Sequence, residues 1–136
     1  MKSKELHTIA VLSETIGREI YPVDDKYSRY DAYDLNNNIY EVKVREIYYN
    51  DTLIEFDKFA FNLMYAENFN KRFLYVVQMG DMGYVFDVSA LYNEGYDFNW
   101  ENKEMPKQTE FSQNSKIKKL VGYISIEHTI FAFKIW

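Results

Sequence analysis

The chain has 136 residues, a length that fits one domain covering residues 1–136. It contains no cysteine, which excludes disulfide scaffolds, thiol catalysis and zinc–thiolate sites. Sixteen lysines and arginines against 21 aspartates and glutamates give a formal net charge of −5. Because neutralisation of phosphates by basic residues supplies much of the affinity of non-specific DNA binding, this balance argues against a lone subunit that grips duplex DNA tightly.

Histidine chemistry and membrane insertion are not expected either. His7 and His128 are the only histidines, so neither a histidine-based metal site nor a Ser-His-Asp triad is predicted. The N-terminus lacks an apolar signal region, and no run approaches 18 apolar residues. We therefore expect a soluble, intracellular protein in the cytoplasm, of the host cell if the gene belongs to a phage, with no membrane partner.

The first predicted element is an amphipathic helix over Lys4–Gly17, which Gly17 would end. Its apolar residues recur at helical spacing: Leu6, Ile9, Ile16 and Ile20. Glu14 borders the apolar stripe and has two interpretations. It is either a carboxylate that reaches a site at the sheet edge or an exposed partner of Arg18 at i, i+4.

Strand-like residues on both sides of Asn36-Asn37-Asn38 predict a β-hairpin over Tyr30–Arg45. We estimate its register from the turn as Leu35 opposite Ile39, Tyr33 opposite Glu41, and Asp31 opposite Lys43. Side chains alternate between the two faces of a strand, so Asp31, Glu41 and Lys43 share one face, and Asp34 falls on the other.

Two carboxylates and an ammonium group on one sheet face suit metal-assisted hydrolysis. Asp31 and Glu41 offer the hard oxygen ligands that Mg²⁺ and Mn²⁺ prefer. Lys43 lies two residues after Glu41 and reaches a metal-bound water or a substrate phosphate. The alternative interpretation is a surface salt bridge between Asp31 and Lys43, which contributes little stability.

The spacing Asp31…Glu41-Val42-Lys43 resembles the motif of the PD-(D/E)xK nuclease superfamily, with Tyr30 in place of the proline. The resemblance implies an α/β fold of the α+β mixed-sheet type: a restriction-endonuclease-like core whose central mixed β-sheet is flanked by helices. It implies metal ligation by Asp31, Glu41 and the Val42 carbonyl, with Glu14 as the helix carboxylate that completes such sites. Lys43 would orient the attacking water.

After the hairpin, a second helix is predicted over Leu53–Phe69, with Glu55 and Asp57 on its solvated face. The helix flanks the active site in the family that the chain resembles, so Lys58 is a candidate for contact with substrate. Apolar residues then predict a strand hairpin, Phe73–Met79 and Tyr84–Val88, around a glycine-containing turn.

The last third of the chain is less regular. Ser89–Ser115 is expected to form a long polar loop in which Trp100 either anchors the loop to the core or stacks on a base. Strands are predicted over Leu120–Ile126 and over the tail from residue 129 to 136. Three lysines form the densest basic patch, either as phosphate contacts or as a solvated charge run: Lys116, Lys118 and Lys119.

These observations favour a metal-dependent nuclease that hydrolyses phosphodiester bonds, most simply a deoxyribonuclease acting on DNA with Mg²⁺ or Mn²⁺. Its small size suggests structure-selective cleavage or action within a phage or mobile-element complex. The apolar tail needs cover, which suggests a homodimer or a recruiting protein partner. Two alternatives stay open: an inactive nuclease-fold module that binds protein or nucleic acid, and a fortuitous D…ExK pattern in an unrelated α+β protein.

Overall fold

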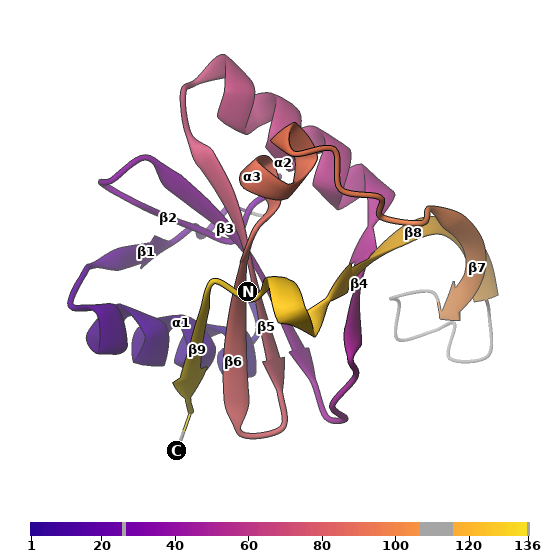
Figure 1. Ribbon diagram of the computed structural model, residues 1–136. Helices are drawn as coiled ribbons and strands as arrows, with labels where there is room; N and C mark the ends of the chain where they lie inside the picture. The colour runs from indigo at the N-terminus through magenta and orange to yellow at the C-terminus, as the bar shows by residue number, and fades with distance from the viewer. Residues whose placement is uncertain (26, 107–115, 136) are drawn as a thin grey trace.

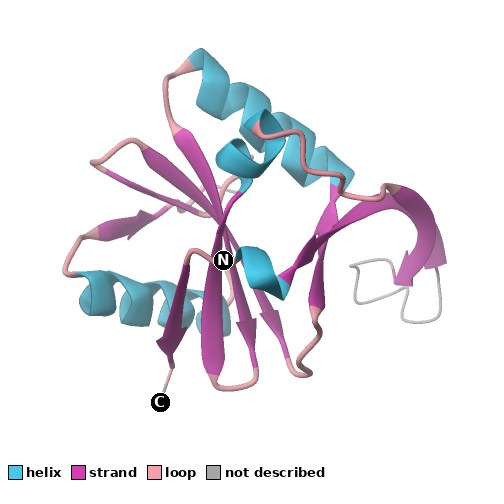
Figure 2. Ribbon diagram, in the orientation of Figure 1, coloured by secondary structure: helices cyan, strands magenta, loops and turns pink. Residues whose placement is uncertain are grey.

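The computed structural model describes residues 1–25, 27–106 and 116–135. Two sheets and three α-helices make up the fold (Figures 1 and 2). The helices are α1 (Ser3–Ile16), α2 (Phe56–Asn68) and α3 (Val88–Asn93), and a short 3-10 turn, η1, covers Ile126–His128. The strands are β1 (Ile20–Pro22), β2 (Ala32–Asp34), β3 (Asn38–Arg45), β4 (Asp51–Glu55), β5 (Arg72–Met79), β6 (Met82–Asp87), β7 (Glu101–Pro106), β8 (Lys116–Ser125) and β9 (Phe131–Lys134).

The main sheet has six strands in the order β1-β2-β3-β5-β6-β9, and it is mixed because β3 and β5 run parallel while the other pairs are antiparallel. Helix α1 covers one face, while α2 and α3 cover the other (Figure 1). Burial on both faces explains the nearly continuous apolar run of β5, in which Tyr75 and Val76 point to opposite cores. This arrangement confirms the predicted central mixed sheet flanked by helices.

A second sheet of three strands, in the order β4-β8-β7, projects to one side of the main sheet (Figure 1). One face of it packs against the α2–α3 core through Ile54 and Ile124. Trp100 anchors the segment before β7, because it stacks on Phe98 and lies directly above Gly122, where any side chain would collide with its ring. Of the two interpretations of Trp100, the structure therefore shows the anchor.

Helix α1 confirms the first predicted helix. Ile9 and Leu12 are buried against the sheet, and Gly17 ends the helix in the left-handed conformation with φ +66°. Its backbone N–H bonds to the carbonyl of Glu14, and that of Arg18 bonds to Ser13, as expected for a helix that closes on glycine.

Several predicted boundaries are wrong. Residues 53–55 belong to β4 rather than to the start of a helix, and β7 and α3 occupy much of the predicted loop Ser89–Ser115. Strand β4 pairs with β8, some 70 residues later, so tertiary pairing overrides the local helical pattern. Within the described residues, no helix is long and apolar enough to span a membrane.

Candidate active site

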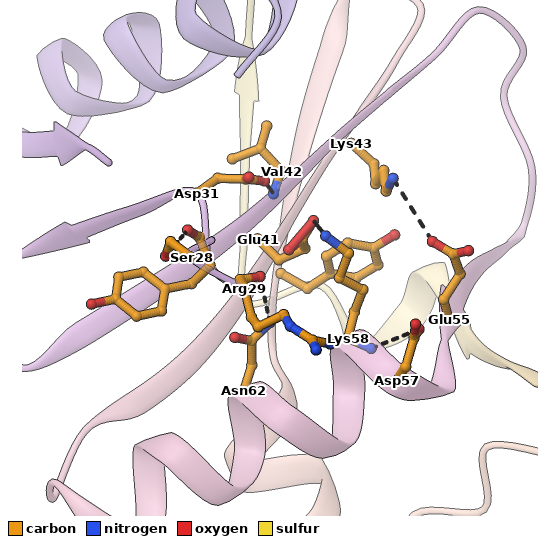
Figure 3. Close-up of polar contacts among 12 residues, drawn as sticks. Ser28, Arg29, Asp31, Glu41, Val42, Lys43, Glu55, Asp57, Lys58 and Asn62 are labelled. Atoms are coloured by element: carbon orange, nitrogen blue, oxygen red, sulfur yellow. Dashed lines mark hydrogen bonds and ion pairs between the residues drawn. The ribbon is translucent and has the colours of Figure 1, made fainter. Parts of the chain in front are cut away.

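Asp31 and Glu41 lie opposite each other where the β2–β3 pairing ends. The register pairs Ala32 with Tyr40, and the Asp31 N–H continues the ladder by donating to the Tyr40 carbonyl at 2.8 Å. The Asp31 carboxylate folds back over β3, where its Oδ2 accepts the Val42 N–H at 2.8 Å (Figure 3). Strand β2 is short, so β3 presents Glu41 and Lys43 beyond the end of this neighbour.

The predicted register is wrong by two residues, because the turn begins one residue earlier than expected. Asp34 makes the turn: its Oδ1 accepts the N–H groups of Asn36 at 2.8 Å and Asn38 at 3.1 Å. Leu35 is therefore an exposed turn residue, not a partner of Ile39. A shift of two preserves the face of every side chain, so Asp31, Glu41 and Lys43 still share a face and Asp34 lies on the other.

Glu41 is nearly buried, with 2% of its surface exposed, and its Oε2 has no hydrogen-bond partner among the residues that the structure describes. Its Oε1 lies 3.7 Å from the Lys58 Nζ, which extends toward Glu41 from the first turn of α2 (Figure 3). Burial, together with the nearby Asp31 carboxylate, raises the pKa of Glu41 from 4.5 to about 8, against the opposing effect of Lys58 and Lys43. A buried carboxylate oxygen without a partner is costly, and a bound cation would remove that cost.

Lys43 does not pair with Asp31, contrary to the salt-bridge interpretation. Its Nζ lies 3.9 Å from Oε2 of Glu55, and Oε1 of the same carboxylate accepts a bond from Lys119 at 2.6 Å. Glu55 is buried at the end of β4, so its assignment to a solvated helix face is wrong. Sequence reasoning missed this residue because the strand that orients it is fixed only by pairing with β8.

The α1 carboxylate beside the site is Glu5, not Glu14. Burial and the nearby Asp31 raise the pKa of Glu5, while Lys43 and Lys2 lower it. The Glu5 carboxylate is therefore close enough to Asp31 and Lys43 to interact with them electrostatically. Glu14 is exposed, nine residues and about 13 Å farther along the helix. Arg18, its expected partner, bonds instead to Asp34 at 3.5 Å. Helix α1 runs away from the site, a direction that helical spacing alone does not reveal.

The three predicted phosphate-contact lysines are separated by the structure. Lys119 joins the Glu55 pair beside Lys43, while the exposed Lys118 points to the opposite face of β8. The side chain of Lys116 lies outside the described residues. Lys119 and Lys58 are therefore the candidate substrate-contacting lysines that the structure brings to the site.

The donor set fits a magnesium or manganese ion. Asp31 and Glu41 supply adjacent carboxyl groups, and Oε2 of Glu41, which has no hydrogen-bond partner among the described residues, is a buried oxygen that would bind a cation once Glu41 releases its proton. In the described ranges no three aspartate, glutamate, histidine or cysteine side chains form a group able to hold a metal. Two carboxylates nevertheless suffice for Mg²⁺, which commonly keeps several waters and takes further oxygens from substrate phosphates.

Comparisons with known proteins give one informative result. No protein-family model matches the chain, and no curated protein matches it. Among solved structures, the chain is similar to Hjc of Archaeoglobus fulgidus, a Holliday junction resolvase from an archaeal hyperthermophile, with a TM-score of 0.56. The match covers 98% of this chain and 96% of that one at 15% sequence identity. The chain therefore shares the fold of this resolvase, which agrees with the restriction-endonuclease-like core expected from the sequence.

Proposed function

We propose that the protein is a metal-dependent endonuclease that hydrolyses phosphodiester bonds in DNA and prefers branched substrates. The observation that carries the proposal is the buried, unpartnered Oε2 of Glu41 beside Asp31, with Lys43 two residues along the same face. A D…ExK pattern on an exposed strand would have no reason to bury one carboxyl group against another, because the arrangement costs stability once Glu41 is ionised unless a cation is bound there. The shared fold with a junction resolvase supports the preference for branched DNA.

The residues divide the chemistry as follows. Asp31, Glu41 and the Val42 carbonyl would hold Mg²⁺ or Mn²⁺, with Glu5 as the further carboxylate; the ion would acidify a water and neutralise charge that builds on phosphorus. Lys43, held by Glu55, orients the attacking water or steadies the scissile phosphate. Lys58 and Lys119 would contact neighbouring phosphates, since their ammonium groups pair with Glu41 and Glu55 of the site.

The deciding assay is cleavage of a DNA panel: a four-way junction, a flap, a linear duplex and a single strand. It is run with Mn²⁺ and at low salt, because low salt offsets the acidic surface. We expect nicks near the branch point of the junction by wild type, and none by Asp31→Ala. Intact DNA across the whole panel would favour the second candidate, an inactive nuclease-fold module, for which the net charge of −5 is the supporting observation.

The proposal extends to assembly. A four-way junction has two symmetry-related strands to cut, so a homodimer would match its symmetry. Recruitment by a partner, as in a phage or mobile-element complex, is the alternative to a homodimer. Sedimentation equilibrium with and without a four-way junction distinguishes a dimer from a recruited monomer.

A further inference from the structure

A second polar pocket lies at the turn ends of β3 and β5, away from Asp31 and Glu41. Its volume is about 460 Å³, and its walls consist of three cationic residues, Arg18, Lys71 and Arg72, together with four asparagines. No carboxylate lines it. A wall of cations and amide donors, without a competing anion, has the chemistry of an anion-binding site.

The pocket is held in shape by the backbone. The N–H of Arg72 donates to the carbonyl of Asn37 at 2.7 Å, which ties the turn before β5 to the turn before β3. Asn37 and Asn70, one in each turn, adopt left-handed conformations with φ of +65° and +54°. Asp34 stabilises the β2–β3 turn, because its Oδ1 accepts the N–H groups of Asn36 and Asn38. Because both turns are fixed without a ligand, binding an anion would cost little ordering entropy.

The positive charge of the pocket is only partly compensated. Arg18 lies 3.5 Å from Asp34, and Arg72 lies 3.3 Å from Asp87. Lys71 is half-buried, yet it forms no ion pair with any residue in the described part of the chain. A half-buried ammonium without a counter-ion is expected where an external anion supplies the missing charge. The chain as a whole is acidic, with a net charge of −5, so the three cations of this pocket form a local region of opposite charge.

We propose that this pocket binds a phosphate of the nucleic acid backbone, as a second contact that positions the strand engaged at the candidate active site. The inference rests on the proposed function. Asn38 in the pocket lies three residues before Glu41 on β3, a distance of about 10 Å along the strand. That span corresponds to about three nucleotides of rise in one strand of B-form DNA. Asn38 lies on the face of Asp34, opposite to Glu41, so the pocket would hold the backbone where the nucleic acid strand passes the turn end of β3, at least a few nucleotides from the scissile bond.

The test measures binding without cleavage. A fluorescent four-way DNA junction and a linear duplex of equal length are titrated with protein in EDTA, at KCl concentrations from 50 to 200 mM. Lys71→Gln is the informative variant, because Lys71 has no partner whose loss would unsettle the fold. Lys134→Gln, which removes an exposed lysine on the edge strand β9, is the matched control, and Lys71→Arg retains the charge.

We expect Lys71→Gln to reduce the slope of log affinity against log salt by about 0.9, so that the affinity lost between 50 and 200 mM KCl becomes about 3.5-fold smaller. Lys71→Arg and Lys134→Gln should follow wild type. Equal slopes and affinities for Lys71→Gln and Lys134→Gln overturn the proposal.

A separate titration with inorganic phosphate, followed by the NMR signals of the asparagine side-chain amides, identifies the source of the anion. One outcome is that the pocket signals respond to free phosphate while Lys71→Gln leaves DNA binding unchanged. That combination indicates a site for free anions and overturns the nucleic-acid assignment. Failure of the proposed nuclease function gives a different result. In that case the wild type cuts no DNA, yet Lys71→Gln still lowers the salt slope of DNA binding.

Discussion

Replacement of Glu41 by glutamine tests the candidate active site through stability, before any substrate is added. The pKa of Glu41 is about 8 in the folded protein against 4.5 as its ordinary value, so between these pH values the folded chain keeps a proton that the unfolded chain releases. The free energy of unfolding therefore falls as pH rises, by about 1.4 kcal/mol per pH unit. At pH 7 the accumulated cost is about 3 kcal/mol, and the loss is complete above pH 8.

Glu41→Gln removes the titration and keeps the shape, because the amide is neutral and donates to the Asp31 carboxylate. In EDTA we expect the variant to stay close to wild type at pH 4.5, where the glutamate is protonated in the folded protein and half protonated in the unfolded chain. At pH 7 it should be more stable by about 3 kcal/mol, which for a chain of this length corresponds to a rise in Tm of about 10 °C. Differential scanning calorimetry between pH 4.5 and 8 measures both trends.

Metal should reverse this ranking. An ion that binds only the folded state stabilises wild type by about 4.1 kcal/mol at one thousand times its Kd at that pH, which exceeds the lead of about 3 kcal/mol, whereas Glu41→Gln has lost a charged ligand and should gain little. Glu14→Gln, at an exposed position on α1, is the control and should follow wild type throughout. Parallel pH profiles for wild type and Glu41→Gln in EDTA, or equal stabilisation of both by Mg²⁺, would refute the assignment of Glu41 as a buried metal ligand.

Four further predictions concern the other residues of the site. Lys43→Ala should slow junction cleavage by about 10²-fold or more with metal affinity largely unchanged in calorimetry; equal rates would remove Lys43 from the chemistry. Asp31→Ala should lose both cleavage and metal binding, and retention of either contradicts its role as ligand. Glu5→Gln should weaken Mn²⁺ binding about tenfold, whereas Glu14→Gln should leave it unchanged, and the opposite ranking would restore the original helix assignment. Glu55→Gln should lower the cleavage rate as Lys43→Ala does. If the effects of the two substitutions on the rate add in the double variant, Glu55 does not act through Lys43.

The sequence was sufficient to predict that Asp31, Glu41 and Lys43 share one face of the sheet, because the determinants of that arrangement are local. The Asp31…Glu41-Val42-Lys43 spacing lies within one hairpin, and the two-residue periodicity of strands placed the three side chains on one face despite an error in register. The error itself came from Asp34. Its side chain bonds the turn N–H groups, so the turn starts at Leu35 rather than at the run of asparagines.

The surroundings of the site depended on contacts that no local pattern encodes. Glu55 faces Lys43 only because β4 pairs with β8, and residues Glu55 and Val121 of that pair are far apart in sequence. Glu5 reaches the site only because α1 begins at the site and runs away from it. Helical spacing showed which face of α1 is buried but not which end approaches the catalytic residues, so Glu14 and Glu5 were equally compatible with the buried stripe.

The charges around the site have a consequence for the order of binding. Lys58 compensates Glu41, and Glu55 compensates one of the two ammonium groups that it bonds, so most of the local charge is balanced. A cation at Asp31 and Glu41 would satisfy Glu41 in place of Lys58 and leave the Lys58 ammonium without its partner. The site would then carry an excess positive charge toward a phosphate. Metal and DNA binding should therefore be positively coupled, and since coupling is reciprocal, each would raise the affinity of the other by the same factor.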